Sequence, residues 1–459
     1  MKQPRALYLL NFVSLWECFS YYGMRSLLVL YMIRTFDYSD VDAFALYALY
    51  TTLVELAGIA GGIVADRFLG FKQSIALGGW TIALGHICMT IPMGSGPLYA
   101  GLALIIVGTG LFRTNCMAFL GEFYQENDVR RDSGYALYYT GINFGGFLAS
   151  IICGIIGEMY GMHFGFGIAC IGMLTGNIAL YFGNEIFEGK GKVPIKSDKF
   201  LPLTIAAMIA LVPLIAISLY RYDIALYIVP LIIFFGGIYI FRGVYQGSIP
   251  EKKKIQTLFF YIGMMVLFYA CEEQLGSSLV VFTERYVDRT TFLGSIPASS
   301  MITFNPLTIL IAGPLLSIFF GKYCKDALKK IGISFAFLGI SFLILFLGCF
   351  LVSATGFVSL GYGLTGVIIL SVGELFIGPT ILSAASEIAA PKLRGLTMSP
   401  VTLGFSLANM LSGFLSTLFI VPEGADSLTG YSGGFGIVAC IALACGGSSL
   451  IMNKKRIFQ

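Results

Sequence analysis

Residues 6–25, ALYLLNFVSLWECFSYYGMR, form an apolar stretch long enough to cross a lipid bilayer, and Glu17 and Arg25 lie within it. The whole chain of 459 residues is 57% hydrophobic and 12% charged, whereas soluble proteins contain about 25% charged residues. Water cannot solvate so large an excess of apolar surface, but lipid can. The sequence therefore predicts an all-α membrane protein.

Fourteen stretches have the length and composition of a membrane span. They begin near residues 6, 43, 74, 97, 134, 164, 200, 224, 256, 303, 331, 357, 396 and 433. An even number of spans puts both termini on one side, and a cytoplasmic N-terminus places most of the Lys and Arg residues in cytoplasmic loops. We therefore expect a multi-pass protein of the bacterial inner (cytoplasmic) membrane with both termini cytoplasmic.

Two polar connections divide the spans into groups. Residues 185–199 (EIFEGKGKVPIKSDK) follow the sixth span, and residues 247–254 (GSIPEKKK) precede the ninth. The expected organisation is an N-terminal six-helix bundle (1–190), a linker with an inserted transmembrane helix pair (191–254) and a C-terminal six-helix bundle (255–459). Six plus six spans indicate a major facilitator arrangement, in which the solute site lies at the midplane between the halves.

Charged residues inside the spans are the candidate functional groups. Each costs about 2.5–3.5 kcal/mol at the bilayer centre, so such residues usually face a cavity or a partner. The set comprises Glu17, Arg25, Glu55, Arg113, Glu272, Glu273 and Glu374. Glu17, Tyr21 and Arg25 are spaced four apart and share one helix face. For any single member, the alternative is a structural ion pair that locks the bundle.

Seven motifs accompany these charges along the chain. They are FSYYGMR (19–25), GGIVADR (61–67), GTGLFRTN (108–115), YYTGINFG (138–145), EEQLGSS (272–278), IPAS (296–299) with Asn305-Pro306, and GEL (373–375). With them the sequence resembles the proton-dependent oligopeptide transporters, a family of the major facilitator superfamily, over almost its whole length. The inserted helix pair resembles that of the prokaryotic members.

Residue chemistry and the resemblance assign the same roles in a central cavity. Arginine binds a carboxylate bidentately and keeps its proton, so Arg25 and Arg113 suit the anionic end of a dipeptide. The glutamates of the second half, Glu272, Glu273 and Glu374, suit the ammonium end. Hydrogen bonds to the substrate are expected from Tyr21, Tyr22, Asn143 and Asn305.

Two gating roles are also expected. The resemblance implies that Arg25 and Glu273 pair across the halves as an outer gate. Asp66 and Arg67, in the loop motif between the second and third spans, are expected to hold neighbouring helices by a pairing that breaks during transport. Simple anchoring at the membrane interface is the alternative for Asp66 and Arg67.

The first-helix motif departs from the family pattern. Proton-coupled members carry Glu-x-x-Glu-Arg before the Phe-x-Tyr-Tyr-Gly segment, whereas this chain has Ser14 and Cys18 around Glu17. Further departures are Arg113 for a lysine, Val401 for a tryptophan and Glu55 for a pocket tyrosine. The proton-coupling candidates are Glu17, Glu55, Glu273 and Glu374. We hypothesise that coupling operates through Glu17 facing Arg113, with Glu374 as a second site.

The sequence thus predicts a secondary transporter that imports di- and tripeptides with protons by alternating access and functions as a monomer. The alternatives are an uncoupled facilitator or exchanger, a transporter of another small carboxylated solute, and a sensor that binds without transport. An enzyme is not expected, because no nucleophile has an adjacent base. Neither a cofactor, a metal nor a nucleic-acid partner is expected.

Overall fold

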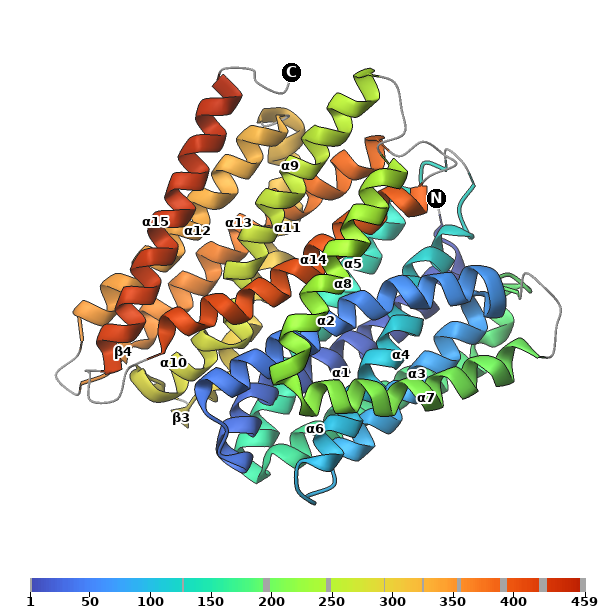
Figure 1. Cartoon of the computed structure of the whole chain (residues 1–459), viewed down its shortest axis with the longest axis horizontal. Coiled ribbons are helices and arrows are strands. Elements are labelled where there is room, and N and C mark those ends of the chain that lie inside the picture. Colours follow the sequence, from blue (N-terminus) through green and yellow to red (C-terminus); the bar gives the residue numbers. More distant parts are fainter. Residues whose placement is uncertain are drawn as a thin grey trace. The chain divides into compact units, whose positions relative to one another are not determined.

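The computed structural model describes residues 2–125, 128–192, 199–244, 249–292, 294–323, 326–352, 356–388, 394–420 and 427–454. Residues 193–198 and 245–248 of the predicted linker and helix pair lie outside these ranges. Figure 1 shows that the described chain is built almost entirely of helices. Two compact units, each combining two segments of the sequence, make up the chain.

Unit 1 comprises Met1–Asp37 and Leu53–Ala225. Its elements are α1 (Arg5–Phe36), the second half of α2 (Asp40–Val64), a π-helical turn η1 (Ala65–Leu69), α3 (Gly70–Met89), α4 (Gly96–Gly121), α5 (Arg131–Tyr160), α6 (Met162–Phe182), the 3₁₀ turn η2 (Asn184–Phe187), α7 (Phe200–Tyr220) and the start of α8 (Tyr222–Val244). Helix α1 packs against α5 and α6, and α3 packs against α4 and α6. These contacts enclose large side chains such as Phe112 and Phe166, which are fully buried.

Glycines allow the helices of unit 1 to approach backbone to backbone. A Cβ atom at Gly145 in α5 would lie 2.2 Å from the carbonyl oxygen of Leu15 in α1. Likewise, a Cβ atom at Gly78 in α3 would lie 2.6 Å from the carbonyl oxygen of Gly108 in α4. Small residues at such crossings are common between membrane helices, where close packing drives association. The crossing at Gly145 thus brings α1, the helix that contains Glu17 and Arg25, into close contact with α5.

Unit 2 comprises Tyr38–Thr52 and Leu226–Gln459. Besides the remaining parts of α2 and α8, it contains α9 (Ile249–Glu272), η3 (Glu273–Gly276), α10 (Ser278–Tyr286), η4 (Ala298–Thr303), α11 (Phe304–Tyr323), α12 (Ala327–Phe350), α13 (Leu360–Ile388), α14 (Arg394–Ser416), η5 (Thr417–Phe419) and α15 (Ser427–Lys454). Helix α12 packs against α13 and α15, and α9 packs against α13 and α14. An aromatic cluster of Phe282, Phe419, Tyr431 and Phe435 lies in its core.

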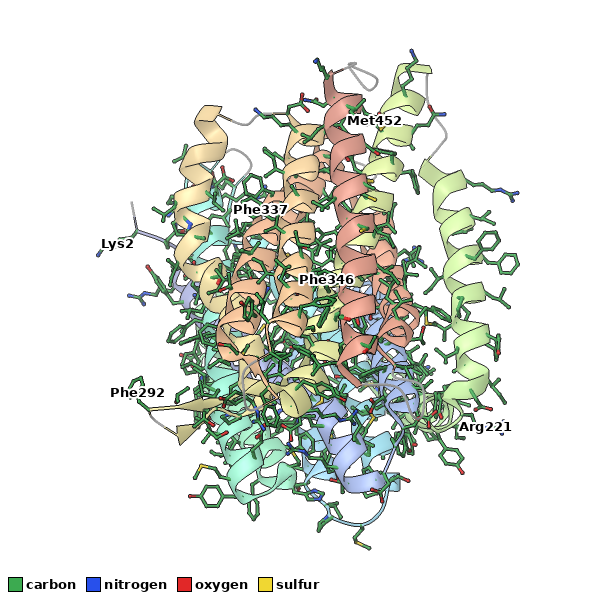
Figure 2. All side chains as sticks on the ribbon, turned by 90° about the vertical axis from the view of Figure 1, so that its left-hand side faces the viewer. Lys2, Arg221, Phe292, Phe337, Phe346 and Met452 are labelled. Atoms are coloured by element: carbon green, nitrogen blue, oxygen red, sulfur yellow. The ribbon has the colours of Figure 1, made fainter. Side chains whose placement is uncertain are left out.

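The described part of unit 2 also contains four short strands, which were not predicted from the sequence. Strand β1 (Val287–Asp288) pairs in parallel with β4 (Val358–Ser359), and β2 (Thr290–Thr291) pairs antiparallel with β3 (Gly294–Ser295). Phe292, in the turn between β2 and β3, projects outward and is 96% exposed (Figure 2). The strands connect helix ends, and the paired residues Val287 of β1 and Val358 of β4 are buried in the core of unit 2.

Twelve helical segments of the described chain are long and apolar enough to cross a membrane. One of them, Asp40–Met89, spans 50 residues and contains α2, η1 and α3. In the α7 segment only 6% of the residues are buried, and in the α8 segment 17% are. Such exposed apolar helices require lipid around them. The predicted helical membrane protein is thus confirmed, while the number of fourteen spans stays a prediction.

Candidate functional site

A salt bridge between Glu17 of α1 and Arg113 of α4 lies inside unit 1. The Nη2 of Arg113 donates to Oε1 of Glu17 at 2.9 Å, and its Nε donates to Oε2 at 3.4 Å. The Glu17 side chain is 2% exposed, whereas that of Arg113 is 32% exposed. Two parallel hydrogen bonds from the planar guanidinium fix the orientation of the carboxylate. The Arg113 side chain is therefore partly accessible, whereas the Glu17 carboxylate is enclosed by the helices of unit 1.

Aromatic rings extend this arrangement along α1. The guanidinium carbon of Arg113 lies 4.2 Å from the ring centre of Tyr21, and that of Arg25 lies 5.9 Å from the ring centres of both Tyr21 and Tyr22. Cation–π contacts at these distances stabilise a guanidinium by about 0.5–2 kcal/mol. The predicted face of Glu17, Tyr21 and Arg25 thus exists, and Arg113 completes it from α4.

The substituted positions of the first-helix motif make neutral contacts. The hydroxyl oxygens of Ser14 and Tyr138 lie 2.7 Å apart and share a hydrogen bond between α1 and α5. The thiol of Cys18 donates to Oε2 of Glu17 at 3.6 Å. Since Ser14 and Cys18 carry no formal charge, Arg113 is the cation that the described structure pairs with Glu17.

The other predicted residues of unit 1 occupy separate places. Asn143 is half-buried on α5 and donates to the carbonyl of Tyr139 at 2.9 Å, within its own helix. Asp66 and Arg67 are exposed in the π-helical turn η1, between α2 and α3. Glu55 is half-buried in α2. Asp66 and Arg67 therefore sit at a break in the helix, whereas the Asn143 amide is directed to backbone.

Unit 2 presents a smaller polar group. The amide nitrogen of Asn305 in α11 donates to Oε2 of Glu374 in α13 at 2.9 Å, which brings two predicted residues together. Glu273 is half-buried at the first position of the 3₁₀ turn η3, where α9 ends. No group of three or more His, Cys, Asp or Glu residues that would hold a metal ion occurs in the described part of the chain.

Comparison with known sequences identifies this arrangement of helices and buried charges. The sequence model of the POT family matches residues 72–430. The chain belongs to the POT family. It is therefore a membrane transporter rather than an enzyme.

Individual POT relatives match over nearly the full chain. The Di-/tripeptide transporter of Lactococcus lactis subsp. lactis (strain IL1403) is 31% identical, and the match covers 91% of this chain and 90% of the relative. Dipeptide and tripeptide permease A of Escherichia coli (strain K12) is 27% identical over 92% of this chain and 86% of the permease.

A solved structure agrees with this assignment. The crystal structure of a peptide transporter POT in complex with sulfate superimposes with a TM-score of 0.87 and is 29% identical, covering 99% of this chain and 95% of the other. The predicted resemblance and the predicted major facilitator fold are thus confirmed.

Gln274 of this POT chain is a further candidate functional residue, outside the set predicted from the sequence. Its Nε2 donates to the carbonyl oxygens of Ala270 at 3.2 Å and Ser412 at 3.0 Å. Its Oε1 accepts from the hydroxyls of Ser278 at 2.7 Å and Ser416 at 2.9 Å. The amide thereby ties the end of α9 to α14 next to Glu273. A signal was available, because a glutamine in an apolar span with serine four residues later indicates such a bond.

We expect Gln274→Leu to lower the thermal unfolding midpoint and to impair uptake. The leucine removes both donors and both acceptor contacts, and each buried polar group left without a partner costs about 1–3 kcal/mol. Thermal unfolding of detergent-purified POT protein measures the effect. Gln256→Leu makes the same change at an exposed position of α9 and serves as the control. Equal midpoints for the two variants would contradict the role assigned to Gln274.

Proposed function

We propose that the protein imports di- and tripeptides together with protons. The observation that carries the proposal is the salt bridge between Glu17 and Arg113, with Arg113 stacked on Tyr21. A partly exposed guanidinium held by a buried tyrosine ring suits a carboxylate, and a buried glutamate suits a proton. The names of the Lactococcus and Escherichia relatives, which are di- and tripeptide transporters, support peptides as the solute class.

A peptide has a negative carboxylate at one end and a positive ammonium group at the other. Unit 1 has cationic side chains suited to the carboxylate, and unit 2 has anionic side chains suited to the ammonium group. In unit 1, Arg113 and Arg25 would bind the carboxylate, with Tyr21, Tyr22 and Asn143 as hydrogen-bonding neighbours. In unit 2, Glu374 and Glu273 would bind the ammonium group, and the Asn305 amide orients the Glu374 carboxylate. The outer-gate role of Arg25 and Glu273, and the gating role of Asp66 and Arg67, are part of the proposal.

Proton coupling would follow from competition for Arg113. While Glu17 is ionised, two N–H groups of Arg113 are engaged by its carboxylate. Protonation of Glu17 removes the charge that holds them, so the guanidinium becomes available to a substrate carboxylate. A proton and a peptide would then bind together, which is the requirement for symport. Glu374 is the second proposed proton site, and Glu55 and Glu273 are further candidates.

Location and assembly complete the proposal. Lys2, Arg5, Arg130 and Lys190 gather at one end of unit 1, near the N-terminus. Under the positive-inside rule this end faces the cytoplasm. We place the protein in the bacterial inner membrane with both termini cytoplasmic, functioning as a monomer.

Uptake of labelled dialanine into liposomes tests the function directly. We expect accumulation when the outside is acidic and only equilibration when the pH is equal on both sides. Equal uptake under both conditions would remove symport and leave a facilitator or exchanger. Competition by unlabelled dialanine but not by free amino acids is expected for peptide specificity. The reverse pattern would favour another small carboxylated solute, and binding without uptake would favour a sensor.

A further inference from the structure

A cavity of about 220 Å³ lies at the end of unit 1 where α1 begins. Its wall includes Arg5 at the start of α1, Phe123 and Arg130 from the connection between α4 and α5, and Glu188 and Lys190 from the segment after α6. One water molecule needs only about 10–15 Å³ of such space. The cavity therefore has room for a polyatomic group, and it is separate from the salt bridge of Glu17 and Arg113.

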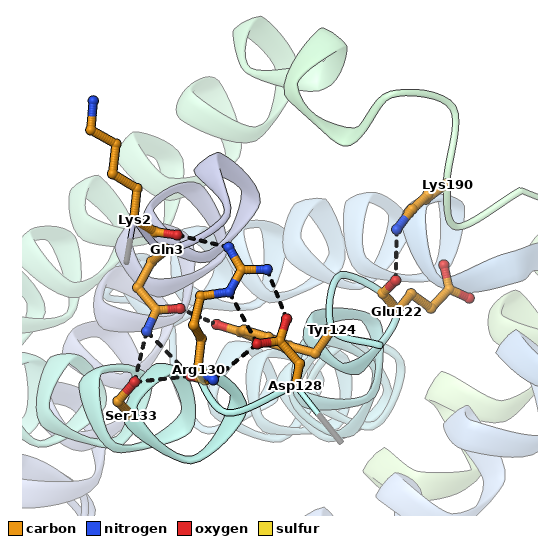
Figure 3. Close-up of polar contacts among 8 residues, drawn as sticks. All are labelled: Lys2, Gln3, Glu122, Tyr124, Asp128, Arg130, Ser133 and Lys190. Carbon is orange, nitrogen blue, oxygen red and sulfur yellow. Dashed lines mark hydrogen bonds and ion pairs between the residues drawn. The ribbon is translucent and has the colours of Figure 1, made fainter. Parts of the chain in front are cut away.

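A network of hydrogen bonds fixes Arg130 in this wall (Figure 3). Its Nη2 and Nε donate to the Asp128 carboxylate at 2.7 and 3.0 Å, and its Nη1 donates to the carbonyl of Lys2 at 2.8 Å. Gln3 donates to the carbonyl of Arg130 at 3.2 Å and to the hydroxyl of Ser133 at 2.8 Å. Three of the five guanidinium N–H groups are thus engaged, and two remain for a ligand.

Lys190 is fixed in a similar way. Its Nζ donates to the carbonyl of Glu122 at 2.7 Å (Figure 3). It also lies 4.9 Å from the ring centre of Phe123. The Glu122 carboxylate in turn accepts from the backbone N–H of Gly191 at 3.0 Å. An ammonium group has three N–H donors, so two of them remain for a ligand.

The charges of the wall favour an anion. Arg5, Arg130 and Lys190 are cationic, and Glu188 is the one acidic residue among the lining residues. Behind the wall, Asp128 pairs with Arg130 and the Glu122 carboxylate accepts from Gly191, so the excess of cations belongs to the residues that line the cavity. The positive end of the α1 dipole adds to this field, and Pro4, its N-cap, gives no side-chain cap within the described residues. The Asp128 pKa is lowered to about 2, chiefly by the hydrogen bond from the Arg130 side chain, so this pair stays charged in any physiological medium.

We propose that this pocket binds a phosphate group. Arginine and lysine donors with a helix N-terminus are the combination that binds phosphate oxygens. Two sources have this chemistry, namely the headgroup of an anionic phospholipid and free phosphate. The cavity lies where α1 and α5 begin and α4 ends, which is the depth of the headgroups beside membrane-spanning helices.

The full-length protein in nanodiscs provides the test. One set of discs contains phosphatidylcholine alone, a second adds phosphatidylglycerol, and inorganic phosphate is titrated against the first set at constant ionic strength. Thermal unfolding and native mass spectrometry of retained lipid report binding. The test variant is Arg5→Gln with Lys190→Gln, which leaves the Arg130 network intact. We expect its affinity for the phosphate group to fall about fivefold for each charge removed.

A matched control distinguishes binding in the pocket from a general effect of positive charge at this end of unit 1. Lys2→Gln with Lys192→Gln removes two positive charges from the same end of unit 1, and neither side chain lines the cavity. This control is expected to bind like the wild type. A response to phosphatidylglycerol alone identifies the headgroup as the ligand, and a response to inorganic phosphate alone identifies free phosphate. Unchanged binding in the test variant, or an equal loss in the control, would overturn the proposal while leaving the transport function untouched.

Discussion

Glu17→Gln is expected to abolish uptake driven by a proton gradient while exchange of labelled for unlabelled dialanine continues. Glutamine keeps the size of the side chain and a hydrogen-bond acceptor for Arg113, but it cannot take up and release a proton. Arg113 would then be permanently available to a substrate carboxylate. Proteoliposomes loaded with unlabelled dialanine measure exchange, and empty ones with an imposed pH gradient measure driven uptake.

The control for this experiment is Glu185→Gln, an exposed carboxylate in the turn after α6. It should leave both activities at the wild-type level. If Glu17→Gln still accumulates dialanine in response to the gradient, proton coupling does not depend on Glu17. Loss of both exchange and driven uptake would assign to Glu17 a structural role instead.

Arg113→Gln is expected to have the second large effect, on both stability and transport. It leaves the Glu17 carboxylate, 2% exposed, without its cation. Breaking a buried ion pair on one side costs about 3–5 kcal/mol, and the 32% exposure of Arg113 reduces this value. Losing a hydrogen-bonded charge also weakens binding of a substrate carboxylate by roughly ten- to a hundredfold. Thermal unfolding and the concentration dependence of dialanine exchange measure the two effects.

The double variant Glu17→Gln with Arg113→Gln separates stability from binding. The double variant removes the uncompensated buried charge of Glu17. Its thermal unfolding midpoint should therefore be higher than that of Arg113→Gln and close to that of the wild type. Its affinity for dialanine should stay low, because the guanidinium is still absent. Recovery of affinity together with stability would contradict the assignment of Arg113 to the substrate carboxylate.

The phosphate-binding pocket and the transport residues are both in unit 1, but they depend on different kinds of interaction. Glu17 is enclosed by helices and pairs with the partly exposed Arg113, whereas Arg130 and Lys190 each donate to a backbone carbonyl at the helix ends. Phospholipid bound at Arg5 and Lys190 would bridge α1, the connection between α4 and α5, and the segment after α6. Lipid composition is therefore expected to change the stability of unit 1.

The sequence by itself determined the helical class, the family and the face of α1. Apolar stretches of sufficient length must become helices in lipid, because every backbone polar group needs an internal partner there. The spacing of Glu17, Tyr21 and Arg25 gave their common face, since residues four apart meet on a helix. These properties depend on the composition and residue spacing within a single segment, so they can be predicted without knowing which segments pack together.

The tertiary structure alone decided the partners of these residues. The departure of the first-helix motif from the family pattern led to the hypothesis that Glu17 faces Arg113, but the bidentate geometry and the stacking of Arg113 on Tyr21 depend on how closely α4 approaches α1. The bonds of Gln274 to α14 and the cavity at Arg5 join residues far apart in sequence. Such contacts depend on helix packing distances, and close approaches at residues such as Gly145 set these distances. The sequence of a single segment therefore does not specify these long-range contacts.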